Sequence, residues 1–339
     1  MPKHRPSLKD LAAQLGVSIA TVSRALRSSP EIGPEMQQRV KALAKQLNYR
    51  PNPFARSLRQ ETPKVIGVVV PNIVTHYFSA VLDGIESEAN AQGYSVISAN
   101  SHEDTADEVR AIDNFLGLHV DGIIACLAQD TRDYSHLEEL STIGVPLVLF
   151  GRTCLPDLFS SVTANGDEAA YQATTHLLQT GSRRVAFVGG PPHLDMVVRR
   201  KHGYLEALRD AHLPIDRTLV ACGRIDFDEA SRAVRQLLER PDRPDAILAF
   251  NDIIAFAAYT TIQQMGLRMP DDVAIIGFTD DVHAAFVTPR LSAIADQSTL
   301  MGQTACRLLL RAIGGDTKIY HEIVPQKLII RDTSAKKRG

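Results

Sequence analysis

Apolar positions near the start of the chain recur every three or four residues, the period of a helix that buries one face. The first stripe covers residues 8–15 and stops at Gly16, because a tight helix end favours a residue that accepts a positive φ. A second stripe follows Ser18, whose hydroxyl can cap a helix, and a third follows Pro34, a favourable first-turn residue. Three short helices with a tight turn between the first two predict an all-α helix-turn-helix domain over residues 1–50.

The helical pattern is interrupted at Pro51 and Pro53, where the chain enters a segment with little periodicity. Residues 54–59 can form only one short helix, and a helix of that length is unstable by itself in water. We therefore interpret residues 51–63 as a hinge helix and linker.

Between residues 64 and 333 short apolar runs alternate with amphipathic helices. Buried strands separated by helices predict parallel sheets that are flanked by helices on both faces. The strands are too many for one compact sheet, so two α/β lobes are expected, with a break near residues 163–165. The predicted strands are 65–70, 95–99, 122–125, 146–150, 185–188, 219–221, 246–250 and 273–278, and the predicted helices include 78–92, 166–180, 201–211, 227–239 and 253–265.

Charge is distributed unevenly along the chain, although the formal net charge is only −2. Residues 1–60 contain eleven Lys and Arg against three Asp and Glu, which gives +8, and the remainder contains 26 against 36, which gives −10. A basic N-terminal segment on an acidic body indicates that this segment meets a polyanion such as nucleic acid. A merely solvated basic surface would show the same charge, so charge alone does not decide between the two.

Other function classes find little support in the sequence. The composition, 44% hydrophobic and 22% charged, is that of a globular protein, and the longest apolar runs have the length of strands, far short of a membrane span. We expect no secretory leader, because the first ten residues are polar and basic, and we expect free thiols, because the four cysteines form no CxxC pair. GxSxG, HExxH, Walker and GxGxxG motifs are absent and the eleven histidines lack metal-ligand spacing, so no enzyme, metal or cofactor is predicted.

The second predicted helix has the composition of a DNA-recognition helix. In helix-turn-helix modules this helix enters the major groove, where Ile19 and Ala20 can contact a thymine methyl group and Arg24 can make a bidentate contact with guanine. Thr21, Ser23 and the helix N-terminus suit phosphates. A helical hairpin inside a core is the alternative, but the small polar outer positions and the basic charge do not suit it. The predicted contacts are Ser18, Ile19, Ala20, Thr21, Ser23 and Arg24.

Motifs of one known family are spread over nearly the whole chain. They are residues 7–12 (SLKDLA), 16–18 (GVS), 20–26 (ATVSRAL), 49–52 (YRPN), 53–58 (PFARSL), 66–72 (IGVVVPN), 120–124 (VDGII), 249–252 (AFND), 276–278 (IGF) and 331–333 (RDT). Together they resemble the LacI/GalR family of bacterial transcriptional regulators. The resemblance implies that residues 64–333 form a two-lobed α/β domain like that of periplasmic sugar-binding proteins, which binds effector and dimerises.

The resemblance also implies how the protein meets DNA. A homodimer would bind a palindromic operator, with one recognition helix in each half-site and the two hinge helices folded together in the central minor groove. Leu58 matches the position that wedges between base pairs there, and an apolar wedge bends the duplex; as an ordinary linker residue it would have no such role. Asn52, Arg56 and Arg59 complete the predicted DNA contacts. The chain ends without a leucine heptad, which favours a dimer over a tetramer.

An effector site in the cleft between the lobes is the last implication of the resemblance. An Arg guanidinium and an Asn amide can each hold vicinal hydroxyls or a carboxylate, and Tyr or Phe rings can stack on a sugar ring. The effector positions that the resemblance implies are His76, Tyr77, Phe78, Gly151, Arg152, Arg200, Ile225, Asn251, Thr279 and Asp296.

Two of these positions depart from the commoner family pattern, because Thr279 and Gly151 stand where many relatives carry Asp. Residues 150–152 (FGR) look more like a subgroup that responds to α-glucosides. Leu194 and Met196 stand at positions that match the key contacts of a purine effector, which disfavours a purine. We therefore expect a sugar, either a glucoside or an oligosaccharide.

The resemblance and the basic N-terminal segment together predict a sequence-specific DNA-binding regulator, a repressor controlled by a small-molecule effector. The alternative is a solute-binding protein of a sugar transporter, which the body alone would allow but the basic N-terminal segment argues against. Induction is favoured over corepression because sugar responders in this family usually work so, although the physics permits either sign. We expect the protein to be cytoplasmic, associated with the bacterial nucleoid, and without a membrane partner.

Overall fold

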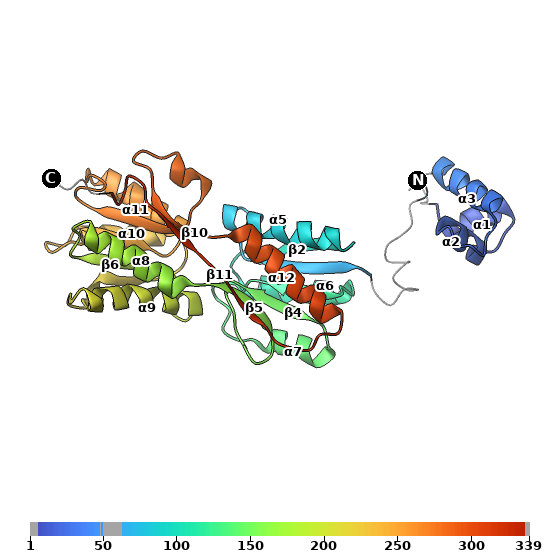
Figure 1. Ribbon diagram of the computed structural model, residues 1–339, viewed down its shortest axis with the longest axis horizontal. Helices are drawn as coiled ribbons and strands as arrows, with labels where there is room; N and C mark the ends of the chain where they lie inside the picture. Colours follow the sequence, from blue (N-terminus) through green and yellow to red (C-terminus); the bar gives the residue numbers. More distant parts are fainter. Residues whose placement is uncertain (1–5, 48, 50–62, 336–339) are drawn as a thin grey trace. The chain divides into compact units, whose positions relative to one another are not determined.

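The structure is a computed structural model of the 339-residue chain and describes residues 6–47, 49 and 63–335. The chain forms two compact units, Met1–Pro63 and Lys64–Gly339 (Figure 1).

The N-terminal unit contains the three predicted helices, α1 (Leu8–Leu15), α2 (Ile19–Leu26) and α3 (Pro34–Gln46). Ser7 and Asp10 form a capping box at the start of α1, in which the Ser7 backbone N–H donates to the Asp10 carboxylate at 2.7 Å. Gly16 ends α1 with a φ of +66°, as the sequence predicts. Leu11, Val22, Ala25 and Val40 are fully buried where the three helices meet, so the predicted apolar stripes do form the core of this unit.

The second unit consists of two lobes, each built on a six-stranded sheet. The first sheet has the order β11-β5-β4-β3-β1-β2 and the second has the order β12-β10-β9-β8-β6-β7. The first-lobe elements are β1 (Val65–Val70), α5 (His76–Ala91), β2 (Ser95–Asn100), α6 (Thr105–Gly117), β3 (Gly122–Ala125), α7 (Ser135–Ile143), β4 (Leu147–Phe150), β5 (Ser160–Ala164), α12 (Ser298–Ile313) and β11 (His321–Val324). The second-lobe elements are α8 (Gly166–Gln179), β6 (Val185–Gly189), α9 (Asp195–Asp210), β7 (Val220–Cys222), α10 (Phe227–Leu238), β8 (Ala246–Ala249), α11 (Asp252–Gln264), β9 (Ala274–Thr279), β10 (Ser292–Ala295) and β12 (Lys327–Ile329).

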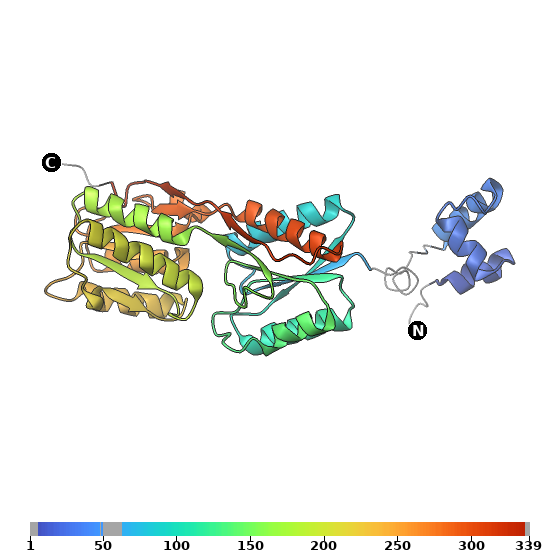
Figure 2. The ribbon, with the colours of Figure 1, turned by 60° about the horizontal axis from the view of Figure 1, so that its bottom comes forward.

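Helices cover both faces of the first sheet, as the continuous apolar strands predict. Val68 and Val70 of β1 belong to a core with α5 and α12, whereas Val69 between them belongs to a core with α6 and α7. Successive residues of a strand point to opposite faces, so one strand contributes to both cores. Figure 2 shows the first-lobe helices on the two sides of the sheet. No helix in the described ranges is long and apolar enough to cross a membrane.

The chain crosses between the lobes three times. It leaves the first lobe at Asn165, at the predicted break, returns at Gln297 between β10 and α12, and crosses again at residues 325–326 between β11 and β12. Only the first crossing is predicted from the sequence, because β5, β10, β11 and β12 are short and contain few large apolar residues. The prediction of parallel sheets is wrong at one edge, where β12 runs antiparallel to β10.

Boundaries of the predicted elements agree to within one or two residues, except in one helix. Helix α9 begins at Asp195, six residues before the predicted start at residue 201. The first turns of α9 contain several charged residues, so the regular spacing of apolar residues, from which the helix was predicted, is interrupted there. The extra turns matter because they include Arg200.

Candidate functional site

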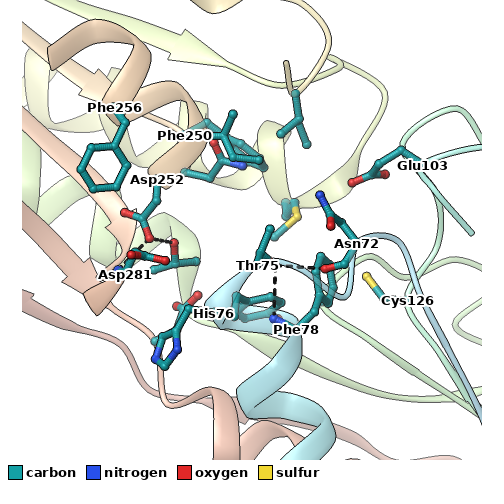
Figure 3. A pocket seen from close by; sticks show the side chains of 18 of the residues that line it. Asn72, Thr75, His76, Phe78, Glu103, Cys126, Phe250, Asp252, Phe256 and Asp281 are labelled. Carbon is teal, nitrogen blue, oxygen red and sulfur yellow. Dashed lines mark hydrogen bonds between the residues drawn. The ribbon is translucent and has the colours of Figure 1, made fainter. Parts of the chain in front are cut away.

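A cavity of about 440 Å³ lies between the two lobes of the second unit. The nine candidate effector residues and Gly151 all line this cavity, although they were predicted only from the resemblance to a family. In Figure 3 Asp252 and Phe256 lie on one side of this cavity and Glu103 and Cys126 lie on the other. Twelve lining residues were not selected from the sequence: Asn72, Thr75, Glu103, Cys126, Met196, Phe227, Phe250, Asp252, Ile253, Phe256, Asp281 and His283.

The first turn of α5 supplies part of the first-lobe wall. Thr75 caps this helix, since its hydroxyl accepts a bond from the Phe78 N–H, and the cap fixes His76 and Tyr77 beside the cavity. The Tyr77 hydroxyl donates to the sulfur of Met301 at 3.0 Å. Burial, and then the charge of Asp296, raise the pKa of Tyr77 well above its ordinary value, so Tyr77 presents a neutral hydroxyl. The Phe78 ring is 7% exposed and belongs mainly to the first-lobe core.

Arg152 lies beside the cavity but already has protein partners. Its guanidinium donates to both carboxylate oxygens of Glu103, at 2.5 and 2.9 Å, and to the Leu127 carbonyl at 2.8 Å. Burial lowers the pKa of Arg152, but its bonds to Glu103 raise the pKa by more, so the group stays charged. This pair shapes the first-lobe wall and leaves Arg152 fewer donors for a ligand than the sequence suggested.

Arg200, from α9, is the least satisfied cation in the cavity. It is 3% exposed, and its guanidinium carbon lies 4.7 Å from the ring centre of Phe250 and 3.9 Å from that of Phe278. It donates to the Phe250 carbonyl, whereas its Nε finds no acceptor among the described residues. Burial lowers the pKa of Arg200, and the nearby charge of Asp296 opposes that shift. A buried guanidinium with an unused donor is suited to bind a ligand oxygen.

Asn251 and Asp252 lie where β8 passes into α11. The Asn251 Oδ1 caps α11 by accepting from the Ile254 N–H at 3.0 Å, which leaves the amide NH₂ for other partners. Asp252 accepts bonds from the Thr279 hydroxyl and from the Asp281 N–H, the latter at 2.8 Å. Thr279 itself has a φ of +87°, a conformation that needs support from its surroundings. Asp252 thus holds the turn that brings Thr279 to the cavity.

The ionisation of Asp252 gives a prediction for stability. Burial raises the pKa of Asp252 to about 7, so the folded chain holds this proton more tightly than the unfolded chain does. Stability contributed by the protonated carboxyl is therefore lost as the pH rises from about 4 through 7. Asp252→Asn, which cannot ionise, should gain stability relative to the wild type as pH rises from 5 to 8, measured by urea unfolding at each pH.

Asp272→Asn is the control for that comparison. In the wild type, hydrogen bonds from Arg268 lower the pKa of Asp272 to about 2. The Asp272 carboxylate is therefore fully ionised throughout the range from pH 5 to pH 8. The Asp272→Asn variant should differ from the wild type by the same amount at every pH from 5 to 8. A pH-independent difference for Asp252→Asn as well would contradict the buried titration.

The two lobes also contact each other beside the cavity. The Arg224 guanidinium of the second lobe pairs with the Asp130 carboxylate of the first at 2.7 Å, and Gln129 accepts from the Ile225 N–H at 2.8 Å. At the crossings, the Gln326 N–H donates to Asn165 at 2.8 Å, and the Gln326 amide donates to Asp296. The cleft is therefore held both at its crossing strands and by direct bonds between lobes.

Of the residues of α2 and its cap that were predicted to meet DNA, Ser18, Ile19, Ala20 and Arg24 are exposed, and Thr21 and Ser23 are half-buried. Ile19 is 40% exposed, and Arg24 pairs with Glu31 at 3.2 Å in a solvent-exposed bond that costs little to break. The Ser18 hydroxyl caps α2 by accepting from the Thr21 N–H at 3.0 Å, and the Ser23 hydroxyl accepts from Arg27. The predicted contacts Asn52, Arg56, Leu58 and Arg59 lie outside the described residues.

Few sequence signals could have found the missed residues. Asp252 directly follows Asn251 and could have been selected as its neighbour. Glu103 could not, because it is 49 positions away from its partner Arg152 and nothing local marks it. Among the described residues no cluster of His, Cys, Asp and Glu could hold a metal ion.

Comparisons with known proteins cover nearly all of the chain. Residues 7–52 match the profile "Bacterial regulatory proteins, lacI family", and residues 174–334 match "Periplasmic binding protein-like domain". Catabolite control protein A of Priestia megaterium is 32% identical over 92% of this chain and 93% of its own length. The HTH-type transcriptional regulator CelR of Thermobifida fusca is 32% identical over 93% of this chain and 94% of its own length.

Solved structures of proteins from the same family also resemble this chain. A complex of the transcriptional regulator CelR with cellobiose has a TM-score of 0.74 at 29% identity and covers 97% of this chain and all of its own. A lac repressor dimer bound to operator and an anti-inducer shares the fold, with a TM-score of 0.85 at 24% identity over 98% of this chain and 99% of its own. The chain therefore belongs to the LacI family of bacterial regulatory proteins, as a DNA-binding transcriptional regulator and not an enzyme or a transporter's binding protein.

Proposed function

We propose that this regulator represses transcription and that a sugar bound in the cavity between the lobes controls its affinity for the operator. The observation that supports a ligand there most directly is Arg200, a buried cation with an unused donor. Asn251 adds a free amide group, and Asp296 adds a carboxylate. Hydroxyl groups of a sugar can both accept from Arg200 and Asn251 and donate to Asp296.

The proposed coupling links the cleft to the DNA-binding end of the chain. Sugar bound between the lobes favours one lobe arrangement over another, and strand β1 of the first lobe directly follows the segment that we interpret as the hinge. A homodimer on a palindromic operator needs its two hinges at one spacing. An arrangement that changes this spacing lowers operator affinity, which gives induction; corepression is the same coupling with the opposite sign.

The proposed DNA contacts are the exposed side of α2 and the segment that follows the helical unit. They are Ser18, Ile19, Ala20, Thr21, Ser23, Arg24, Asn52, Arg56, Leu58 and Arg59. A regulator of this kind works where the chromosome is, so we also propose a cytoplasmic location on the nucleoid.

A gel-shift experiment tests the proposed function. Purified protein is mixed with genomic fragments at moderate salt, and retarded fragments are then challenged with a panel of sugars. We expect one or a few fragments to be retarded specifically and one class of sugar to release them. No specific fragment would contradict the operator-binding proposal, and specific fragments that no sugar affects would contradict the sugar effector.

Arg24→Ala should relax the sequence preference of the protein at one base pair in each half-site. A bidentate Arg–guanine contact contributes about 1–3 kcal/mol of discrimination, and that contribution is lost with the guanidinium. Competition binding with operators mutated one position at a time measures the change. Arg27→Ala is the control, because Arg27 bonds to Ser23 on the same helix and is not a predicted contact; an equal loss at every position in both variants would assign Arg24 to phosphate.

Leu58→Ala should weaken binding to the operator while leaving binding to unrelated DNA nearly unchanged. An apolar wedge acts only where a base step is opened, whereas non-specific binding depends on charge, which this substitution does not alter. Fluorescence anisotropy with operator and random duplexes measures both affinities. Equal losses on the two DNAs would refute the wedge.

A further inference from the structure

The cavity has an apolar wall that the sugar-binding groups do not use. Six apolar side chains from the second lobe line it, on α9, on the β7–α10 segment, at the end of β8 and on α11. They are Met196, Ile225, Phe227, Phe250, Ile253 and Phe256. A sugar alone would leave much of this wall against water.

Phe227 is the least covered residue of the wall. It is the first residue of α10 and is 41% exposed, whereas Ile253, Phe256 and Met196 pack partly against the second-lobe core. The Phe250 ring already lies beside the Arg200 guanidinium, with 4.7 Å between the guanidinium carbon and the ring centre. A large aromatic side chain exposed at a helix start and facing a cavity is a candidate to stack on a flat ligand group.

Two of the polar groups proposed to bind the sugar, Asp296 and Arg200, lie next to the crossing strands. Asp296 lies in the crossing between β10 and α12 and accepts a bond from Gln326 of another crossing. Arg200 packs beside the first crossing, at Asn165, since a Cβ on the next residue, Gly166, would lie 3.3 Å from its Cγ. Phe227 instead follows Arg224 and Ile225, the residues that bridge to the first lobe. Phe227 thus lies near the contacts between the lobes, whereas Asp296 and Arg200 lie near the crossing strands.

We propose that the effector is a glycoside that joins a sugar to a flat apolar aglycone, such as an aryl group. The sugar ring binds Arg200, Asn251 and Asp296, and the aglycone lies against the apolar wall and stacks on Phe227. This proposal rests on the sugar effector proposed above and names its chemical class.

A second sugar ring fits the wall less well than an aglycone does. Hydroxyl groups pressed against Ile253, Phe256 and Met196 would lose water without gaining hydrogen-bond partners, which weakens binding. An aryl group in the same place removes its own apolar surface and that of the wall from water.

The charges that line the cavity bear on the class of sugar. The lining contains four carboxyl groups, of which Glu103 is paired with Arg152, and burial raises the pKa of Asp252 to about 7, so that Asp252 is only partly ionised. Asp281 and Asp296 then face one guanidinium group, that of Arg200. An anionic ligand such as a sugar phosphate or a uronic acid would add negative charge to this excess. The sugar of the effector is therefore neutral.

Calorimetry with matched probes tests the aglycone. The probes are p-nitrophenyl and methyl glucosides in both anomeric forms, with maltose and cellobiose as two-ring sugars, on the full-length protein. We expect a p-nitrophenyl glucoside to bind at least tenfold more tightly than its methyl counterpart and than either disaccharide. Phe227→Ala should reduce that preference about fivefold to tenfold and leave the methyl glucoside within twofold of the wild type, because stacking acts only on the aryl group.

Ile215→Ala is the matched control, since Ile215 is 40% exposed in the same lobe but does not line the cavity. It should leave every affinity unchanged. Equal affinity for aryl and methyl glucosides, tighter binding of a disaccharide, or an equal loss of both probes in Phe227→Ala would overturn the aglycone proposal while a sugar effector stands. If neither the glucosides nor a wider panel of neutral sugars binds, the sugar effector itself fails and the aglycone proposal with it.

Discussion

Replacing Arg200 with Ala is expected to abolish the effector response while leaving operator binding intact. Charged hydrogen bonds in a buried site contribute about 1.5–3 kcal/mol each, and Arg200 has at least one donor that no described residue uses. Effector affinity should therefore fall at least about tenfold, or about 1.4 kcal/mol, for one bond lost, and about a hundredfold for two. Titration of the effector against an operator complex measures this, since the wild type releases DNA and the variant does not.

Two further variants separate ligand binding from damage to the fold. Arg199→Ala removes the neighbouring guanidinium, which is bonded to Asp195 and 45% exposed, and should respond normally. Arg200→Met keeps most of the apolar stem that packs on Phe250 and Phe278, and it removes the charge and the donors. If Arg200→Met folds and binds operator but still responds at wild-type effector concentrations, the effector does not bind through Arg200.

Local signals in the sequence were sufficient for the N-terminal unit. Ser7, Gly16 and Ser18 fix the ends of α1 and the start of α2 by caps that involve residues at most a few positions apart. Residues 65–70, almost entirely Val and Ile, likewise predict β1 because a strand covered on both faces must be apolar throughout. Where the determining contact is local or where burial is complete, the pattern predicts the element.

Elements that depend on distant partners were not predictable in the same way. Strand β10 (SAIA) has only four residues, of which three are small, and it pairs with β9 on one side and with β12 on the other. Helix α12 follows β10 in sequence but packs against α5 of the other lobe, with the backbone carbonyl of Val81 within 2.0 Å of where a Cβ on Gly302 would lie. No local pattern in the sequence indicates which of the two lobes a helix packs in.

In the candidate site, too, some features could be predicted from the sequence and others depend on distant contacts. Family resemblance selected the nine effector positions, and all of them lie around one cavity. Their roles depend on neighbours that resemblance did not select: Glu103 occupies the donors of Arg152, and Asp252 supports the turn at Thr279. The sequence therefore predicts which residues gather around the cavity better than it predicts which of their groups have other protein partners.

Replacing Gly203 with Ala should destabilise the second lobe by about 3 kcal/mol or more. A Cβ at this position would lie 1.9 Å from the Asp167 carbonyl oxygen and 3.0 Å from the Tyr171 nitrogen, so helices α8 and α9 meet backbone to backbone. Neither partner is a flexible side chain, and the helices can only separate, which costs more than ordinary overpacking. Urea unfolding of the full-length protein measures the loss.

Gly117→Ala is the control for Gly203→Ala, because Gly117 ends α6 with nothing within 4 Å of an added Cβ and should be neutral or slightly stabilising. Unfolding of Gly203→Ala within about 0.5 kcal/mol of the wild type would contradict the close helix contact. The contact also bears on function, since Gly203 lies three residues from Arg200 on α9 and Asp167 directly follows the crossing at Asn165. Separation of α8 from α9 moves Arg200 away from the crossing strands, so any Gly203→Ala protein that folds should also need more effector to release DNA.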